Sequence, residues 1–327
     1  MTQRAQGFDN LKALLIFLVV LGHGLECCPG WDGLNSGLYR LIYSFHMPAF
    51  LFLSGWFARL KPRDLTFRLA YLYLLFQVLY QLFGRFVLQS AATPLQITTP
   101  HWLLWYLLVL IFCHLLLPLL EVSSPRRKGA ILLCCVAIAL VSGLDESIGY
   151  YLSLGRLCSF LPYFVLGHYA GQWHQRQTPA PSLKWTAWSG LGVLVASILT
   201  WTMLPLSRKV LWGAEGFEDI GVPWWTEMAA LAVALVWITF LIRVLLPLLN
   251  RPIPLMTALG RGTLPVFLLH GFVIQWLKHH QILAHATPFH VLGLSLGLVA
   301  ILGNPLTARL FQRICTGWWL EKLWNKL

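Results

Sequence analysis

Long apolar runs, broken by short charged or Pro/Gly-rich segments, dominate the pattern of hydrophobic and polar positions along the chain. A helix needs roughly 20 mostly apolar residues to cross about 30 Å of hydrocarbon, and about ten runs approach that length. We place these runs at 11–28, 39–58, 68–88, 101–120, 130–144, 155–173, 185–204, 225–248, 263–280 and 289–312. The pattern therefore predicts an all-α fold, a polytopic membrane helix bundle of about ten transmembrane helices.

Composition supports this prediction, because 57% of the 327 residues are hydrophobic and only 11% are charged. No segment has the composition of a soluble domain or of a long linker, so we expect one integral-membrane domain over residues 1–327. The longest stretch between predicted spans, 206–224, is expected to be a solvated loop or a lid over an outward-facing site.

Positive charge is distributed unevenly between the two predicted surfaces. If the N-terminus lies inside, most Lys and Arg fall on the cytoplasmic side, as short cytoplasmic loops prefer. The clusters are Arg59/Lys61/Arg63/Arg68, Arg126/Arg127/Lys128 and Arg251/Arg261. This asymmetry predicts cytoplasmic N- and C-termini and accounts for the net charge of +12 without any nucleic acid partner. The inner surface remains suited to an anionic ligand or anionic lipid.

The first predicted span carries ionisable residues, which are expensive in hydrocarbon and are typical of functional sites. On a helix, Lys12 and His23 lie on one face, about three turns or 16 Å apart. Glu26 follows His23 at i+3, so its carboxylate can reach the imidazole. A carboxylate that orients a histidine is the arrangement that general-base catalysis uses. His23 and Glu26 are therefore the catalytic candidates.

Two other histidines are predicted to lie at a similar depth, His46 in the second span and His270 in the ninth. An intramembrane histidine is also commonly an interhelical hydrogen-bond partner, and that structural interpretation stays open for both. A zinc site built from His23, His46 and His270 is a further alternative, although we expect no metal. Trp102, beside His101 at the start of the fourth span, lies where aromatic belts are usual.

Three stretches resemble the acyltransferase family 3 integral-membrane proteins, particularly the branch described as fucose 4-O-acetylase-like. They are "FDNLKALLIFLVVLGH", with a basic residue before the histidine, "FHMPAFLFLSGW" and "LGRGTLPVFLLH". The aromatic "PHWLLWYLLVL" is similar to a fourth family element. The resemblance covers essentially the whole chain and implies a ten-span bundle. The family often has Arg where this chain has Lys12, which offers a point charge and no bidentate fork.

The resemblance implies an acyltransferase that moves an acyl group, usually acetyl, from cytoplasmic acyl-CoA to a hydroxyl of a surface glycan or a lipid-linked sugar. It implies that His23 acts as the base or carries the acyl group as a covalent relay. Lys12, Arg68 and Arg261 are then candidates for binding the donor phosphates. His46, His270 and Trp102 are candidates for binding substrate. A bacterial inner membrane is the expected setting, and the lipid bilayer, acyl-CoA and the sugar acceptor are the expected partners.

A transporter or flippase is the competing interpretation, in which His23 and Glu26 form an intramembrane proton relay. Such folds often contain two related halves, and we find no convincing internal repeat.

Overall fold

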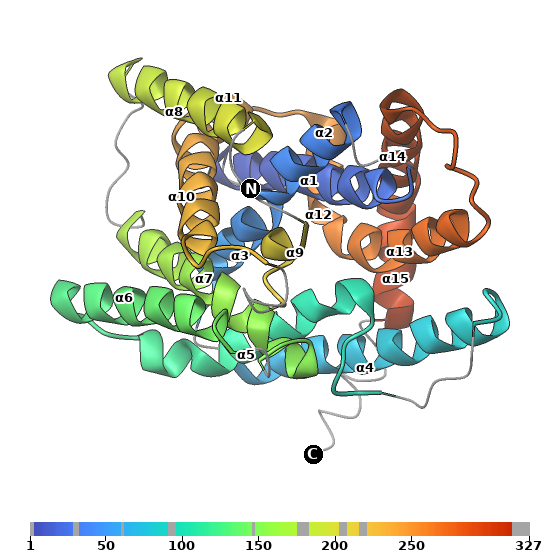
Figure 1. Cartoon of the computed structure of the whole chain (residues 1–327), viewed down its shortest axis with the longest axis horizontal. Helices are drawn as coiled ribbons and strands as arrows, with labels where there is room; N and C mark the ends of the chain where they lie inside the picture. The colour runs from blue at the N-terminus through green and yellow to red at the C-terminus, as the bar shows by residue number, and fades with distance from the viewer. Residues whose placement is uncertain are drawn as a thin grey trace. The chain divides into compact units, whose positions relative to one another are not determined.

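A computed structural model describes residues 3–28, 33–59, 62–90, 96–145, 148–174, 183–202, 208–215 and 221–315 (Figure 1). All of the regular elements within these ranges are helices. This confirms the predicted all-α class.

The helices fall into two compact units, each of which combines segments far apart in the sequence. The first unit comprises Met1–Asn35, Tyr71–Thr93 and Leu246–Leu327, and the second comprises Ser36–Ala70 and Pro94–Leu245. Helix α4 (Pro62–Phe86) contributes residues to both units. Because this division follows contacts within the chain, the expectation of one membrane domain stays a prediction.

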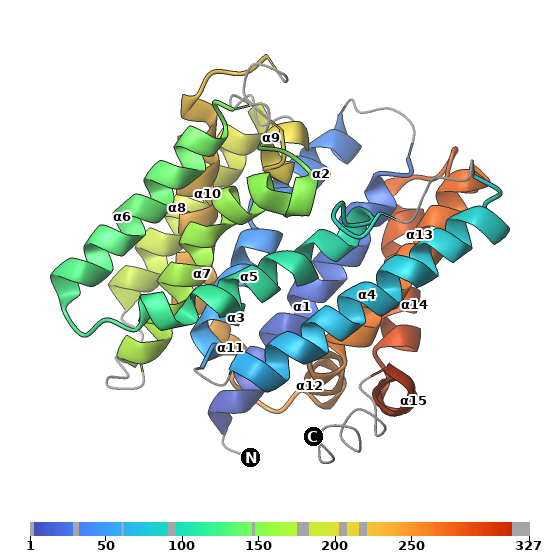
Figure 2. The ribbon, with the colours of Figure 1, turned by 90° about the horizontal axis from the view of Figure 1, so that it is seen from below.

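The first unit is built around α1 (Gln3–Leu25), which packs against helices from the C-terminal part of the chain (Figure 2). These helices are α11 (Leu246–Leu249), α12 (Pro254–Arg261), α13 (Thr263–His279) and α14 (Pro288–Leu302), followed by α15 (Pro305–Cys315). Side chains around the middle of α1, such as Leu15, Ile16 and Val20, are fully buried. The unit thus holds the first predicted span, with its His23, among helices of the last quarter of the sequence.

The second unit contains the central helices of the chain. Their bounds are α2 (Leu34–Tyr43), α3 (His46–Phe57), α5 (Trp105–Leu120), α6 (Pro125–Ser142), α7 (Leu154–His174), α8 (Leu183–Thr202), α9 (Arg208–Trp212) and α10 (Trp225–Phe240). A π-helical turn, Leu241–Leu245, continues α10. A Cβ added at Gly55 would lie 2.0 Å from the carbonyl oxygen of Phe164, and one at Gly167 would lie 2.0 Å from that of Phe52. Glycine at both positions lets the backbones of α3 and α7 touch, as small residues do between membrane helices.

Three described helical segments are long and apolar enough to cross a membrane by themselves: Gln6–Leu25, Trp102–Leu120 and Trp225–Leu249. The number becomes five if two bent pairs are each one span. In these pairs α12 meets α13 at 76° and α14 meets α15 at 56°. The predicted run 39–58 is broken as well, because the turn at Ser44 and Phe45 separates α2 from α3. The predicted total of about ten spans stays a prediction.

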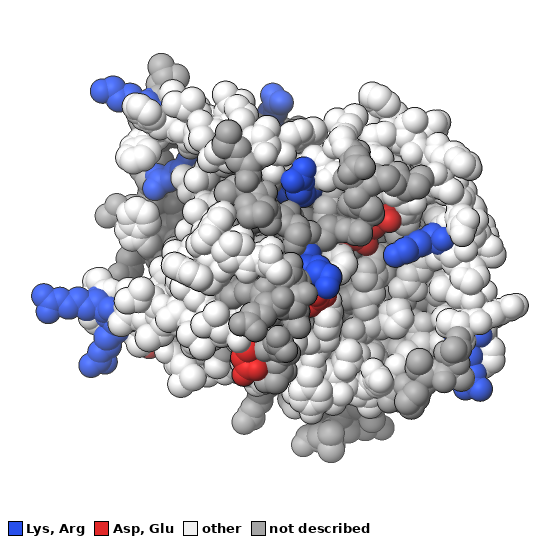
Figure 3. Space-filling view, in the orientation of Figure 1, with Lys and Arg blue, Asp and Glu red and all other residues white. Residues whose placement is uncertain are grey.

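Apolar side chains cover much of the described surface. Figure 3 shows one face on which Lys and Arg are scattered and Asp and Glu are fewer. Along α8, for example, Trp185, Trp188 and Leu194 are more than half exposed. Large exposed apolar surfaces are unusual on soluble monomers but normal on helices that face lipid. The fold is that of an integral membrane helix bundle.

Candidate active site

The last turn of α1 places His23 beside a carboxylate. His23 Nδ1 lies 3.4 Å from Glu26 Oε1, and the two side chains are 13% and 9% exposed. This is the i+3 contact that helical spacing predicts. A carboxylate at this nitrogen favours the tautomer with hydrogen on Nδ1, which leaves the lone pair on Nε2 for chemistry.

His270 on α13 joins this pair within the first unit. Its ring stacks on that of His23, with centroids 5.5 Å apart and planes inclined by 28°. His270 is fully buried, and its Nδ1 lies 2.8 Å from the carbonyl oxygen of Val266. Because a carbonyl oxygen only accepts, Nδ1 must carry the hydrogen, and in the neutral ring Nε2 is an acceptor. Tyr80 on α4 fixes the same helix, because its hydroxyl donates to the carbonyl oxygen of Leu268 at 2.9 Å.

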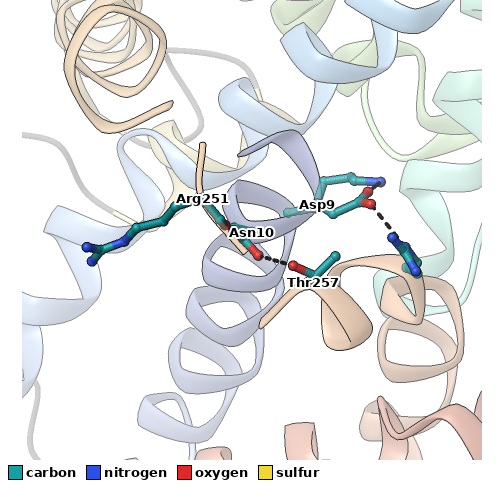
Figure 4. Close-up of polar contacts among 6 residues, drawn as sticks. Asp9, Asn10, Arg251 and Thr257 are labelled. Carbon is teal, nitrogen blue, oxygen red and sulfur yellow. Dashed lines mark hydrogen bonds and ion pairs between the residues drawn. The ribbon is translucent and has the colours of Figure 1, made fainter. Parts of the chain in front are cut away.

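A charged cluster lies near the other end of α1 (Figure 4). Asp9 Oδ1 accepts from Lys12 Nζ at 2.8 Å, and Asp9 Oδ2 accepts from Arg261 Nε at 3.3 Å. The structure therefore brings together two of the three residues predicted to bind the donor. Asp9 was not among the predicted residues, although its i+3 spacing to Lys12 indicates such a contact.

Asn10, next to Asp9, ties this part of α1 to the chain that leads into α12. Its Nδ2 donates to the carbonyl oxygens of Leu249, at 2.8 Å, and Arg251, at 3.0 Å. Its Oδ1 accepts from Thr257 Oγ1 at 2.8 Å (Figure 4). Asn10 is fully buried, so these bonds satisfy an amide that would otherwise be costly to bury. Asn10 was also missed, since its partners lie about 240 residues away in the sequence.

His46, Trp102 and Arg68 belong to the second unit and are described by themselves. His46, the first residue of α3, is buried and its Nδ1 donates to the carbonyl oxygen of Ile42 at 2.8 Å. Its neutral ring, like that of His270, therefore has an acceptor at Nε2. Arg68 is exposed on α4. Lys61, a predicted inner-surface cation, lies outside the described residues.

Trp102 lies in a strained turn. Its φ of 38° is in the left-handed region, which a bulky side chain seldom adopts and which is often found at functional sites. Leu152, with φ of 49°, adopts the same region in the turn before α7, and its N–H donates to the carbonyl oxygen of Thr98 at 2.7 Å. Two strained turns thus lie side by side in the second unit.

An aromatic and charged network lies close to these turns. The Arg156 guanidinium lies 5.1 Å from the ring centroids of both Trp105 and Tyr150, and its Nε donates to the carbonyl oxygen of Trp212. The Tyr150 hydroxyl donates to Glu215 Oε1 at 2.8 Å. Burial and this carboxylate together raise the pKa of Tyr150 to about 12, so the hydroxyl remains a donor at neutral pH.

All of these residues come from segments predicted to lie at or near the outer surface, including 206–224, of which the structure describes 208–215 and 221–224. A cavity of about 10 Å³, with room for about one water molecule, adjoins the network and is lined by Glu215, Ser142 and Glu227. Glu227 is nearly buried and is hydrogen-bonded by Ser159. It was missed in the sequence, although an acid at the start of a predicted span is a signal.

Two further buried histidines, His114 and His168, have polar partners. His114 Nδ1 lies 2.7 Å from the carbonyl oxygen of Leu110, and His168 Nε2 lies 3.2 Å from Glu121 Oε1. The zinc alternative receives no support, because the described ranges contain no cluster of three or more His, Cys, Asp or Glu that could hold a metal ion.

Comparison with known proteins gives a family. A family model described as an acyltransferase domain matches residues 6–309. No curated protein and no solved structure matches the chain. The match extends from the start of α1 into α15 and so includes the His23, Lys12 and Asp9 regions as well as the second unit. The chain belongs to the acyltransferase family 3 membrane proteins.

Proposed function

We propose that this membrane acyltransferase moves an acyl group, in the simplest case acetyl, from cytoplasmic acyl-CoA to a hydroxyl of a surface glycan or lipid-linked sugar. The contact between His23 and Glu26, in a nearly dry part of the bundle, carries the proposal. Buried ionisable groups in membrane helices are expensive, and a proton-transfer role explains why both are kept.

His23 acts as the base. Glu26 holds Nδ1–H, which orients the ring and stabilises the imidazolium that forms during the reaction. Nε2 takes the proton of the acceptor hydroxyl while the hydroxyl oxygen bonds to the thioester carbonyl carbon. The C–S bond then breaks, and the departing CoA thiolate takes the proton back from His23. A relay through an acyl-histidine uses the same atom: Nε2 would bond to the thioester carbonyl carbon and expel the CoA thiolate, and the sugar hydroxyl would then take the acyl group as the bond to Nε2 breaks.

His270 and His46 suit a role in holding the acceptor. In their neutral forms each presents an Nε2 lone pair, because Nδ1–H is bonded to a main-chain carbonyl oxygen. Such a nitrogen accepts a hydrogen bond from a sugar hydroxyl, whereas it has no hydrogen to donate to an oxyanion. For each histidine taken by itself, a role in binding a hydroxyl is thus better supported than one in stabilising the tetrahedral intermediate.

The charged cluster near the start of α1 suits the donor. Lys12 and Arg261 are 31% and 49% exposed, and both share Asp9. Ammonium and guanidinium groups are the usual protein partners of phosphates, which CoA carries at the end remote from its thioester. We place this end of α1 at the cytoplasmic surface of a bacterial inner membrane, with both termini inside.

The strained turn at Trp102 and the neighbouring aromatic rings suit the acceptor, because sugars stack on aromatic side chains. Trp105 and Tyr150 lie beside Arg156 in the segment that we place at the outer surface. We propose that the acceptor sugar binds beside these rings. The fucose 4-O-acetylase-like activity that the sequence suggests is likewise part of the proposal.

The test is transfer of radiolabelled acetyl from acetyl-CoA to membrane glycan or lipid-linked sugar. Membranes containing the native protein are compared with membranes containing His23→Ala at matched protein levels. We expect label with the native protein and a loss of about 10²- to 10⁴-fold in the variant, the usual contribution of a general base. Equal label in both removes His23 from the mechanism. An absence of label in both, together with no thermal stabilisation by CoA, favours the transporter interpretation.

A further inference from the structure

Asp9 makes the two contacts that define the charged cluster, one to each cation. The carboxylate receives Lys12 Nζ on Oδ1 and Arg261 Nε on Oδ2. We propose that Asp9 is a positioning residue that holds Lys12 and Arg261 together as one two-pronged site for the phosphates of the acyl-CoA donor. This inference rests on the proposed function.

The backbone around Asp9 is fixed from both sides. A Cβ added at Gly260 would lie 1.8 Å from the Asp9 carbonyl oxygen, so α12 touches the backbone of α1 at this residue. Asn10, the next residue, is bonded to Leu249, Arg251 and Thr257. Arg261 ends the helix that this contact anchors. The carboxylate is thus a rigid point to which two long, flexible cations are tied.

Exposure shows which groups a ligand can reach. The Asp9 side chain is 15% exposed, whereas those of Lys12 and Arg261 are 31% and 49% exposed. Each cation gives at least one donor to Asp9, and a lysine has three N–H donors and an arginine five. The cluster carries one net positive charge, because two cations share one anion. An incoming phosphate should therefore reach the two cations more readily than the carboxylate between them.

Tying down the cations has an energetic consequence. An isolated lysine or arginine side chain loses rotamer entropy when a ligand immobilises it. Asp9 orders both side chains before the donor arrives, so less of their rotamer entropy is lost when the donor binds. This gain in affinity requires contact with phosphates, so a donor without phosphates does not receive it.

The test uses two donors, acetyl-CoA and S-acetylpantetheine, which has the same thioester and no phosphate. For Asp9→Asn we expect the KM for acetyl-CoA to rise about tenfold, as loss of a charge-assisted contact predicts, and the KM for S-acetylpantetheine to stay within about twofold. In a protein that already carries Lys12→Met and Arg261→Gln, Asp9→Asn should change neither KM further. Arg251→Gln is the matched control, because Figure 4 shows the Arg251 side chain directed away from Asp9. That variant should keep the native KM for both donors.

Three results overturn the inference. An unchanged KM for acetyl-CoA shows that Asp9 does not act on the donor, and a lowered KM shows that Asp9 competes with the phosphates for the cations. An equal rise for both donors shows a structural role only. If Asp9→Asn does not accumulate in membranes, Asp9→Glu keeps the charge, displaces the oxygens by one methylene and should give a smaller rise for acetyl-CoA only. Failure of the proposed function is distinct, because the native protein then transfers acetyl from neither donor.

Discussion

The two ends of α1 hold polar groups in opposite ways. Near its start, Asp9 joins two partly exposed cations, Lys12 and Arg261, in a cluster that water can reach. Near its end, the side chains of His23 and Glu26 are 13% and 9% exposed, and His270 stacks on the histidine. Ion pairs near water are weak individually and suit reversible binding of a charged ligand. A histidine with a carboxylate in a dry site suits proton transfer. One helix thus carries both the cluster that we propose binds the donor and the pair that we propose reacts.

The largest expected effect concerns the reacting end. Glu26→Gln keeps the size of the side chain but removes the charge that stabilises imidazolium on His23. We expect kcat for acyl transfer to fall about 10²-fold, part of the contribution of the base, while the KM for acetyl-CoA changes little. Radiolabelled transfer at varied acetyl-CoA concentration measures both constants. A fall in kcat of less than about twofold would show that Glu26 has no part in the reaction.

The next effect concerns the helix contact that supports the binding end. Gly260→Ala places a Cβ 1.8 Å from the Asp9 carbonyl oxygen, so α12 must move away from α1. Overpacking of this kind lowers the free energy of unfolding by about 1–3 kcal/mol. The unfolding temperature of the detergent-solubilised protein should fall, and the KM for acetyl-CoA should rise as Asp9 and Arg261 separate.

Gly293→Ala provides the control for Gly260→Ala. Gly293 lies in α14, in the same unit, and a Cβ added there meets no atom within 4 Å. Its unfolding temperature should equal the native value or exceed it slightly, because alanine is the better helix former. Equal unfolding temperatures for the two variants would contradict the tight contact between α12 and α1.

The fold was predictable to the extent that hydrophobic runs report helices. The first run, 11–28, overlaps α1, and the run 101–120 overlaps α5 and the turn before it. Runs do not report bends, however. The run 39–58 is continuously hydrophobic, yet the turn at Ser44 and Phe45 divides it into two helices. The hydrophobic pattern reports which side chains are buried, whereas backbone hydrogen bonds determine where a helix ends. The bend before Pro305 escaped prediction in the same way, because it lies inside the predicted run 289–312, whereas the run 263–280 begins just after the bend at Gly262.

The site was predictable only along α1. Helical periodicity was sufficient to predict the contact of Glu26 with His23, and the role of that pair stays a prediction. The contact of Arg261 with Asp9 joins residues 252 positions apart, and no local pattern predicts such a pairing. The stacking of His270 on His23 has the same origin in tertiary packing. Apart from Asp9, these residues were predicted one by one from the sequence, and the packing of α12 and α13 on α1 gathers them into two clusters.

The smallest expected effect separates charge from geometry at the binding end. Lys12→Arg keeps the cation that Asp9 holds and supplies more donors, so the KM for acetyl-CoA should change by at most about fivefold, the equivalent of one exposed ion pair. Lys12→Met removes the cation and should raise that KM by about tenfold or more, with kcat nearly unchanged. Initial rates at low and high salt add a second criterion, because screening should weaken donor binding in the native protein and in Lys12→Arg more than in Lys12→Met. If Lys12→Arg proved as defective as Lys12→Met, the length of the lysine side chain and its compact ammonium group would matter more than the mere presence of a positive charge. Donor binding would then depend on fixed geometry at this end of α1, as catalysis is proposed to depend on it at the other.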